Sequence, residues 1–384
     1  MSLPAIRGHE DVRRRLGAAA LSGSLPQSIL LHGPAGVGKE RLGLWLAQLL
    51  VCEAPATGEP CRSCRPCRLV ERLEHPDVHW FFPLPRPDNA SPEKLREKLE
   101  DARAAELQLR RENPSHVPSY DKAPAIFLAA VQRIQQLAGV KPSMGRRKVF
   151  VVGDAELMVP QESSPEAANA FLKLLEEPPD DTVLIITSSQ PGALLPTIVS
   201  RVLGIRVAPL REAEVSEFLV EVLGVATDEA DRVAKLARGS IGAALRLVAD
   251  EDSGGVRSVA RDLLIAALSN GAVPRYAAAN AQRPFGSRGS FVEVLDALGE
   301  WLRDLMAVAA GAEREVADPA ARDLLRRAVE RRRIHPVSVA SALERVSRAQ
   351  TWAQYNVNPQ LILADLLRGI QEDLLSSSTA GSPQ

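Results

Sequence analysis

The sequence lacks the features that direct a protein into or across a membrane. No apolar run approaches the roughly 18 residues that a bilayer span requires, and the segment from Met1 to Asp11 has no apolar core of the kind that secretory signals carry. The formal net charge is only -1, so the chain as a whole is not attracted to nucleic acid or to anionic lipid. We therefore expect a cytoplasmic protein without membrane contact, which reaches DNA only through a local patch or through partners.

Cysteine is scarce as well, and it is confined to one short segment. The only thiols are those of Cys52, Cys61, Cys64 and Cys67. This crowding in a long chain disfavours a disulfide framework and favours a metal site. Four thiolates complete a tetrahedral shell with no open position, as in structural Zn²⁺ sites, which leaves the nearby His75 and His79 as ordinary polar residues. Free thiols and an iron–sulfur cluster are the alternatives.

The chain is long enough for two or three domains, since 384 residues with 45% hydrophobic side chains fill more than one core. Its first half alternates strand and helix patterns, which predicts a parallel α/β sheet with flanking helices. The predicted strands are Ser28–His32, Lys148–Val152 and Thr182–Thr187. The predicted helices lie within Gly8–Leu25, at Lys39–Val51, at Ile126–Ala138, and from Ser164 and Pro165 to a point before Pro178.

Two further regions differ from this pattern. Prolines follow Phe82, and a highly charged helix is predicted from Pro92 to about Arg111, so residues 83–124 are interpreted as a solvent-exposed surface insertion whose role the sequence does not indicate. From Leu210 onward helical patterns dominate. The last predicted helix is Pro359–Leu375, and a polar tail at 376–384 has nothing to bury, so we expect it to be disordered.

A glycine-rich turn joins the first strand to the following helix. Gly33, Gly36, Gly38 and Lys39 fit the G-x-x-x-x-G-K pattern, in which backbone N–H groups surround phosphate oxygens and the lysine adds a positive charge. The next residue normally offers a hydroxyl to Mg²⁺, but here it is Glu40. A second negative charge at about 4 Å from a phosphate costs on the order of 4 kcal/mol at an effective dielectric of 20.

Whether the loop binds nucleotide therefore stays open. Glu40 either repels the phosphates, turns to solvent, or ligates Mg²⁺ itself. Gly153 follows the strand Lys148–Val152, at the place where a motor ATPase has its metal-binding aspartate, and Asp154 comes next, where the catalytic glutamate is expected. Asp154 is interpreted either as a vestigial catalytic residue or as part of a solvated turn.

Taken with the loop and the cysteines, four further segments resemble the bacterial clamp-loader AAA+ subunits. Asn169–Pro179 is similar to the helix and turn after their second acidic motif, and Ile198–Val202 stands in the place of their Ser-Arg-Cys motif, with Val202 replacing cysteine. Gly239–Leu245 resembles the lid motif, and Asn356–Leu367 resembles the end of the collar. The resemblance implies an AAA+ domain at 1–208 with a zinc module at 52–67, a helical lid at 209–252, and an oligomerising collar at 256–375.

Departures from the family pattern point to its delta-prime-like members. Motor subunits keep a hydroxyl, an Asp-Glu pair and a lid arginine where this chain has Glu40, Gly153 with Asp154, and Gly242. The resemblance implies a stator with little or no ATPase activity of its own and with weak or absent ATP and Mg²⁺ binding. It further implies that Arg201 serves as an arginine finger in a neighbouring subunit's site, where a guanidinium offsets charge in phosphoryl transfer.

By the same resemblance, the partners are motor AAA+ subunits and a delta-like subunit in a hetero-pentamer, which places a sliding clamp on primed DNA. Two other functions stay open. In one, Lys39, Glu40 and Asp154 form a working site, and the chain is an ATP-hydrolysing motor-type subunit. In the other, the cysteine module is a zinc-dependent DNA-binding unit on a degenerate phosphate-loop fold.

Overall fold

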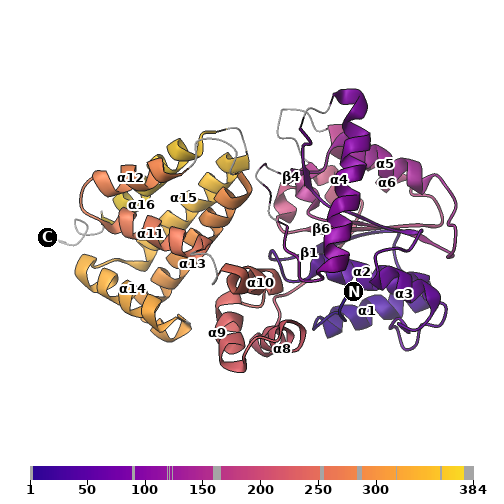
Figure 1. Ribbon diagram of the computed structural model, residues 1–384, viewed down its shortest axis with the longest axis horizontal. Coiled ribbons are helices and arrows are strands. Elements are labelled where there is room, and N and C mark those ends of the chain that lie inside the picture. Colours follow the sequence, from indigo (N-terminus) through magenta and orange to yellow (C-terminus); the bar gives the residue numbers. More distant parts are fainter. Residues whose placement is uncertain are drawn as a thin grey trace. The chain divides into compact units, whose positions relative to one another are not determined.

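A computed structural model describes residues 3–88, 91–118, 120, 122, 124–158, 166–250, 255–282, 288–316, 318–354 and 357–375. The chain divides into two compact units (Figure 1). The first contains Met1–Pro118 and Pro124–Leu245, and the second contains Ser119–Ala123 and Arg246–Gln384. The assignment of an ATPase domain, a lid and a collar stays a prediction.

A five-stranded parallel sheet forms the centre of the first unit, in the order β2-β5-β6-β1-β7. β5 and β6 are buried along their whole length because helices cover both faces, as parallel sheets require. The three predicted strands are confirmed. The two edge strands were not predicted, since they are short and β7 is largely exposed. The strands are β1 (Ser28–His32), β2 (Val78–Phe81), β5 (Lys148–Val152), β6 (Thr182–Ser188) and β7 (Leu203–Arg206).

Six helices of the described residues surround this sheet. α2 packs on β1, β5 and β6, and α5 packs on α6. The apolar core between them includes Phe81, Ile134, Phe150 and Phe171. The predicted helices are confirmed to within a few residues at their ends, but the predicted start at Ser164 and Pro165 lies outside the described residues. The bounds are α1 (Glu10–Ser22), α2 (Lys39–Val51), α3 (Arg65–Glu71), α5 (Leu128–Ala138), α6 (Glu166–Glu176) and α7 (Pro196–Val199).

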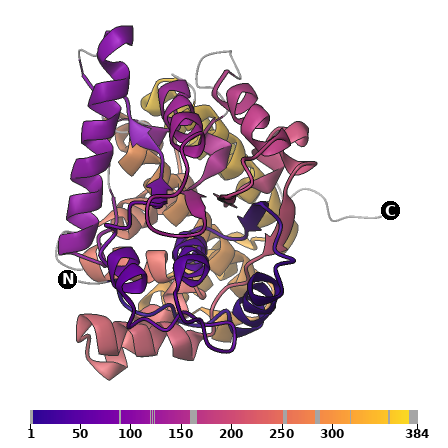
Figure 2. The same cartoon turned by 90° about the vertical axis from the view of Figure 1, so that its right-hand side faces the viewer.

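The predicted insertion is an excursion that starts and ends at one small ladder. β3 (Leu84–Pro85) pairs antiparallel with β4 (Pro124–Ala125), and α4 (Pro92–Glu112) fills much of the chain between them. α4 packs on β3 and α5 and is the long violet helix in Figure 2. The helix itself is confirmed, but its interpretation as a solvent-exposed decoration is wrong, because Leu99, Glu106 and Arg110 are buried.

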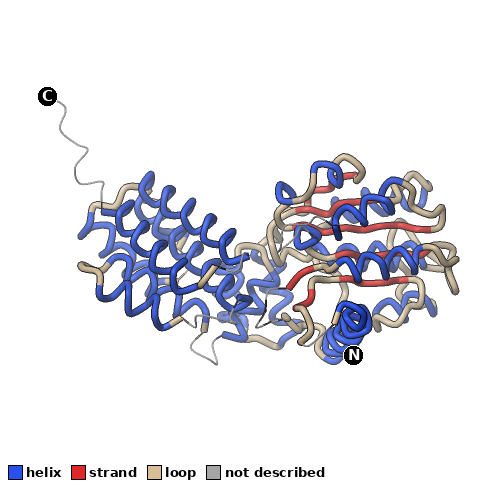
Figure 3. Tube along the Cα trace, turned by 90° about the horizontal axis from the view of Figure 1, so that it is seen from above, coloured by secondary structure: helices blue, strands red, loops and turns tan. Residues whose placement is uncertain are grey.

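Past β7 the described residues form helices and short turns, as predicted from Leu210 onward (Figure 3). None of the helices in the described ranges is both long enough and apolar enough to cross a bilayer. The predicted tail at 376–384 lies outside the described residues. The helices are α8 (Glu212–Leu223), α9 (Thr227–Ala237), α10 (Ile241–Asp250), α11 (Val256–Leu268), α12 (Val273–Ala281), α13 (Arg288–Ala309), α14 (Pro319–Arg332), α15 (Pro336–Gln354) and α16 (Pro359–Leu375).

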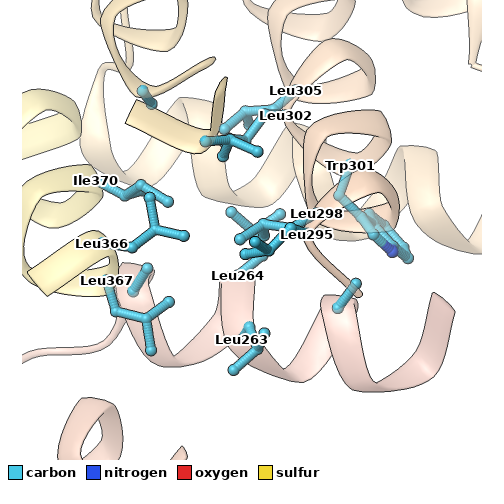
Figure 4. Packing of buried hydrophobic residues seen from close by; sticks show 14 of the residues in the cluster. Leu263, Leu264, Leu295, Leu298, Trp301, Leu302, Leu305, Leu366, Leu367 and Ile370 are labelled. Atoms are coloured by element: carbon cyan, nitrogen blue, oxygen red, sulfur yellow. The ribbon is translucent and has the colours of Figure 1, made fainter. Parts of the chain in front are cut away.

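The second unit has its own apolar core. Leu264 of α11, Leu298 and Leu302 of α13, and Leu367 and Ile370 of α16 are fully buried and point toward one another (Figure 4). Burial of several leucines from each helix stabilises the bundle by an amount that scales with the apolar area removed from water. The helical C-terminal region therefore holds a core that is separate from the sheet.

Replacing a core ring of the sheet should destabilise the first unit. Phe150 is fully buried in β5, and its ring centroid lies 6.5 Å from that of Phe81. Phe150→Ala is expected to lower the free energy of unfolding by about 3–5 kcal/mol because it leaves a cavity. Hydrogen exchange of the β5 and β6 amides measures this loss. Leu109→Ala on the exposed face of α4 is the control, and an equal loss there would contradict the placement of the core.

Candidate functional site

The phosphate loop lies between β1 and α2, in the strand, loop, helix order that phosphate sites use. Gly36 and Gly38 have φ angles of 73° and 98°, a conformation that side chains with a Cβ rarely adopt. A Cβ added to Gly33 would lie 2.1 Å from the carbonyl oxygen of Val207. The glycines are therefore required by this backbone.

Lys39 turns back onto the loop. Its Nζ donates to the carbonyl oxygens of Gly33 at 3.0 Å and Pro34 at 2.8 Å, and to Ser189 Oγ at 2.9 Å. Burial lowers the pKa of Lys39, while three nearby carboxylates, led by Asp154, oppose that shift. All three hydrogens of the ammonium group thus have acceptors within the protein.

The segment before and at the start of α10 lies directly on the loop. Gly242 N–H donates to Gly36 O at 3.0 Å, and Ser240 Oγ donates to Ala35 O at 3.0 Å. A Cβ on Gly242 would lie 2.9 Å from Gly36 Cα. Gly242 is the position where the resemblance expects an arginine in motor subunits, and here glycine permits backbone contact instead.

Glu40 turns neither to solvent nor toward the loop. Trp80 Nε1 donates to Glu40 Oε2 at 2.6 Å. A Cβ built on Gly153 would lie only 2.7 Å from Glu40 Cδ, so the glutamate carboxyl occupies the space of a side chain at position 153. Two departures noted in the sequence, Glu40 and Gly153, are therefore in direct contact. The carboxylate at this place comes from α2 and not from the end of β5.

Arg110 of α4 reaches the same point. Its Nη1 lies 3.9 Å from Glu40 Oε2, and its Nε donates to Glu106 Oε1 at 2.9 Å. The guanidinium carbon lies 4.2 Å from the ring centroid of Trp80 and 4.0 Å from that of Phe82. The insertion thus contributes a stacked cation to the surroundings of Glu40.

Asp154 and Glu156 follow β5 and lie near Lys39. Burial, assisted by the carboxylates of Glu40 and Glu156, raises the pKa of Asp154 to about 7. Asp154 Oδ1 accepts from Ser189 Oγ at 3.4 Å, and Glu156 Oε1 accepts from Ser189 N–H at 2.8 Å. Asp154 therefore lies partly buried beside the loop, in contact with Ser189.

The four cysteines converge as the sequence predicts. Their sulfur atoms all lie within 4.8 Å of one another, and none forms a disulfide. The N–H groups of Cys61 and Cys64 donate to the sulfurs of Cys52 and Cys61, each at 3.3 Å. A hydrogen bond from the Ser63 side chain is the main cause that lowers the pKa of Cys61 to about 6. This donor set fits a tetrahedral metal ion with soft-ligand preference.

The cysteine module is tied to α1 and α2. Glu59 accepts from Arg13 Nη2 at 2.6 Å and from Trp45 Nε1 at 2.8 Å. A Cβ on Gly17 would lie 2.4 Å from the carbonyl oxygen of Gly58, so the two backbones are in direct contact. A metal that orders this module therefore also supports the helices beside the phosphate loop.

Arg201 follows α7 and lies on the surface. Its Nη1 donates to Thr197 O at 2.9 Å, and its Nη2 lies 2.7 Å from Glu176 Oε1. Among the described residues its partners belong to α6 and to α7 with Ser200, and not to the phosphate loop. Lys39, Glu40 and Asp154 are thus brought together, whereas Arg201 stands apart from them.

Sequence reasoning missed Trp80 and Arg110. The apolar and aromatic run Val78–Phe82 was the available signal for the strand that carries Trp80. No local signal marked Arg110, because the charges of α4 are of mixed sign.

A family model described as "DNA polymerase III, delta subunit" matches residues 8–211. The delta′ subunit of DNA polymerase III from Pseudomonas aeruginosa is 38% identical over 173 residues, which cover 45% of this chain and 40% of that protein. The Escherichia coli delta′ subunit is 27% identical over 233 residues, covering 61% and 58%. The tau subunit of the same organism is 28% identical over 216 residues, covering 56% and 27%. The matches therefore span less than two thirds of each relative.

Among solved structures, a gamma-subunit-related protein from Thermotoga maritima is 20% identical. The match covers 93% of this chain and 98% of that chain, with a TM-score of 0.36.

Because the pKa of Asp154 is raised, replacing this residue with asparagine should stabilise the fold by an amount that depends on pH. The carboxyl titrates near 3.8 when unfolded and near 7 when folded, so its contribution to stability is present at low pH and is lost as pH rises through about 7. Asp154→Asn should therefore raise the free energy of unfolding at pH 8 by on the order of 2 kcal/mol, with a smaller gain at pH 5. Urea unfolding at both pH values measures this difference.

Asp101→Asn, on an exposed face of α4, controls for the loss of one negative charge. The same gain at both pH values for Asp154→Asn would contradict the assignment.

Proposed function

The chain belongs to the DNA polymerase III, delta subunit family, and from this we propose that it is the non-motor, stator subunit of a clamp loader. Its relatives named delta′ support the subunit type. One observation carries the proposal further: Glu40 fills the space at Gly153 where a motor subunit has its metal-binding aspartate. A chain built in this way is poorly equipped to hold Mg·ATP for cleavage.

The other contacts of the phosphate loop agree with an idle site. Lys39 donates to three acceptors of the protein, and Gly242 bonds to Gly36 in place of an arginine that contacts phosphate. We expect weak or no nucleotide binding and little intrinsic ATPase activity.

The proposed partners follow from the family. They are motor AAA+ subunits and a delta-like subunit in a hetero-pentamer, a sliding clamp, and primed DNA that is held by the assembly. Relatives named tau and gamma subunits of DNA polymerase III support contact with homologous chains. Residues 256–375, within the helical second unit, are the proposed collar that joins these subunits.

Arg201 is the residue of this chain that is proposed to take part in ATP hydrolysis. Its guanidinium is partly exposed and pairs with Glu176, which is itself half exposed. A surface ion pair of this kind contributes at most about 1 kcal/mol, so a neighbouring subunit's triphosphate competes with it easily. Beside a γ-phosphate the guanidinium stabilises the charge that develops in phosphoryl transfer. We propose that Arg201 acts in trans as an arginine finger.

The proposed metal is structural Zn²⁺ held by Cys52, Cys61, Cys64 and Cys67. Four sulfur donors leave no position for substrate, so the ion orders the module and does not catalyse. Through Glu59 and Gly58 the module supports α1 and α2.

Removal of the guanidinium should abolish stimulation of a motor. In a complex reconstituted with motor-type subunits, Arg201→Ala is expected to slow hydrolysis at the adjoining site by about 10³-fold or more. Single-turnover ATP hydrolysis measures this rate, and size-exclusion chromatography checks assembly. Arg206→Ala removes an exposed arginine of β7 and is the matched control.

Unchanged hydrolysis in an intact complex with Arg201→Ala would refute the trans role. Several turnovers per second by the isolated chain would favour a motor subunit instead. Tight, salt-dependent DNA binding that is lost on chelation would favour a DNA-binding module.

Elemental analysis should find one zinc ion per chain. Cys61→Ser is expected to lower zinc affinity at least about tenfold and to lower the melting temperature, because metal binding and folding of the module are coupled. Co²⁺ substitution, read by its visible absorption, reports tetrahedral thiolate ligation. His79→Gln is the control and should retain the metal. Stoichiometric iron in place of zinc would indicate an iron–sulfur cluster.

A further inference from the structure

We propose that Arg110, supplied by the α4 excursion, is a built-in cation that stands beside Glu40 in place of Mg²⁺ and keeps the phosphate loop independent of nucleotide. The inference deepens the proposed function, since it assumes that the chain's own nucleotide site is idle. It also gives the insertion a role, because α4 positions one guanidinium at the point where α2, β2 and β5 meet.

The surroundings of Glu40 hold its carboxylate in one place. Trp80 Nε1 donates to Oε2 at 2.6 Å, and Arg110 Nη1 lies 3.9 Å from the same oxygen. Gly153 leaves the room that the carboxylate fills. The carboxylate of Glu40 is thus neutralised and oriented by side chains of the protein.

Arg110 is itself fixed from several sides. Its guanidinium lies over the rings of Trp80 and Phe82 at 4.2 Å and 4.0 Å, which is cation–π geometry. Its Nε donates to Glu106 at 2.9 Å, and Glu106 is buried. The side chain of Arg110 is only 11% exposed, so it cannot leave this position without exposing both rings and uncovering two carboxylates.

A divalent ion does not fit these residues. An ion at Glu40 Oε2 would have to displace the Trp80 N–H and would stand next to a guanidinium of the same sign. Position 153 offers no carboxylate as a second ligand, and the residue after Lys39 offers no hydroxyl. The Glu40 carboxylate is here paired with Arg110 and not with a metal ion.

Arg103 of the same helix provides a matched comparison. Its guanidinium carbon lies 4.6 Å from the ring centroid of Phe81, and its Nη2 pairs with Glu100 at 2.8 Å. Arg103, like Arg110, is a residue of α4 that stacks on an aromatic ring, but it pairs with Glu100 and not with Glu40. If Arg110 has the proposed role, Arg110→Met and Arg103→Met should differ in how they respond to Mg²⁺.

The experiment follows Trp80 in the full-length chain labelled with 5-fluorotryptophan. The chain has four tryptophans, and Trp80→Phe assigns the resonance. In the wild-type chain, Mg²⁺ alone and Mg·ADP should leave the ¹⁹F signal of Trp80 unchanged. With Arg110→Met, the signal should shift saturably with Mg²⁺, at an apparent affinity at least about tenfold higher than with Arg103→Met, because one repelling charge is gone.

Two further variants keep the test decisive. Arg110→Lys retains the charge and should still exclude Mg²⁺. If Arg110→Met fails to fold, Glu40→Gln and Glu106→Gln combined with it should restore folding, because neither carboxylate is then left charged without Arg110. Failure of that rescue, or a Trp80 signal that responds to Mg²⁺ equally in the wild-type chain and in Arg110→Met, overturns the proposal. So does a folded Arg110→Met whose Trp80 signal never moves.

These outcomes are separate from those of the proposed function. A chain that stimulates a motor through Arg201, but whose Arg110→Met variant behaves like the wild type, refutes only the inference about Arg110. A chain that shows the Arg110 effect and stimulates no motor refutes only the stator role.

Discussion

A carboxylate that is partly withdrawn from water must have a partner, and the carboxylate of Glu40 imposes this requirement on the first unit. An aspartate at position 153 would place its Cβ 2.7 Å from the Glu40 carboxyl carbon, so glycine there and glutamate at position 40 are one linked change. Trp80 supplies the hydrogen bond, and Arg110 supplies the charge. Residues from β2 and from the insertion thus both contact the Glu40 carboxylate.

This arrangement leaves the phosphate loop with little to gain from a ligand. In a working site the lysine and the loop amides acquire their partners when nucleotide binds, and that gain drives a change of conformation. Here Lys39 already has three acceptors, and Gly36 is bonded to Gly242. Because Lys39 and the Gly36 carbonyl are already paired, these groups gain less from a nucleotide than free groups would. This pairing agrees with the proposed role of a subunit against which motors move.

The sequence predicted features that depend on local pattern and failed where distant segments meet. Apolar runs located β1 and β5, glycines located the loop, and cysteine spacing located the group of four thiols, because each of these signals lies within a few residues. The contact of Arg110 with Glu40 joins residues 70 positions apart, and α4 has the mixed charges of a solvated helix. β7 was missed because it has only four residues and is largely exposed, so it lacks the buried apolar run that marks the central strands.

Arg110 and Arg201 carry the same guanidinium, and their surroundings give them opposite mobility. The Arg201 side chain is 35% exposed, and its ion pair with Glu176 is weakened by water and salt, so this pair opens at small cost in free energy. The Arg110 side chain is 11% exposed and lies against two rings, which excludes the water that would solvate it after departure. In the proposed function, one chain therefore uses a buried guanidinium for its own carboxylate and a more exposed one for a neighbouring subunit.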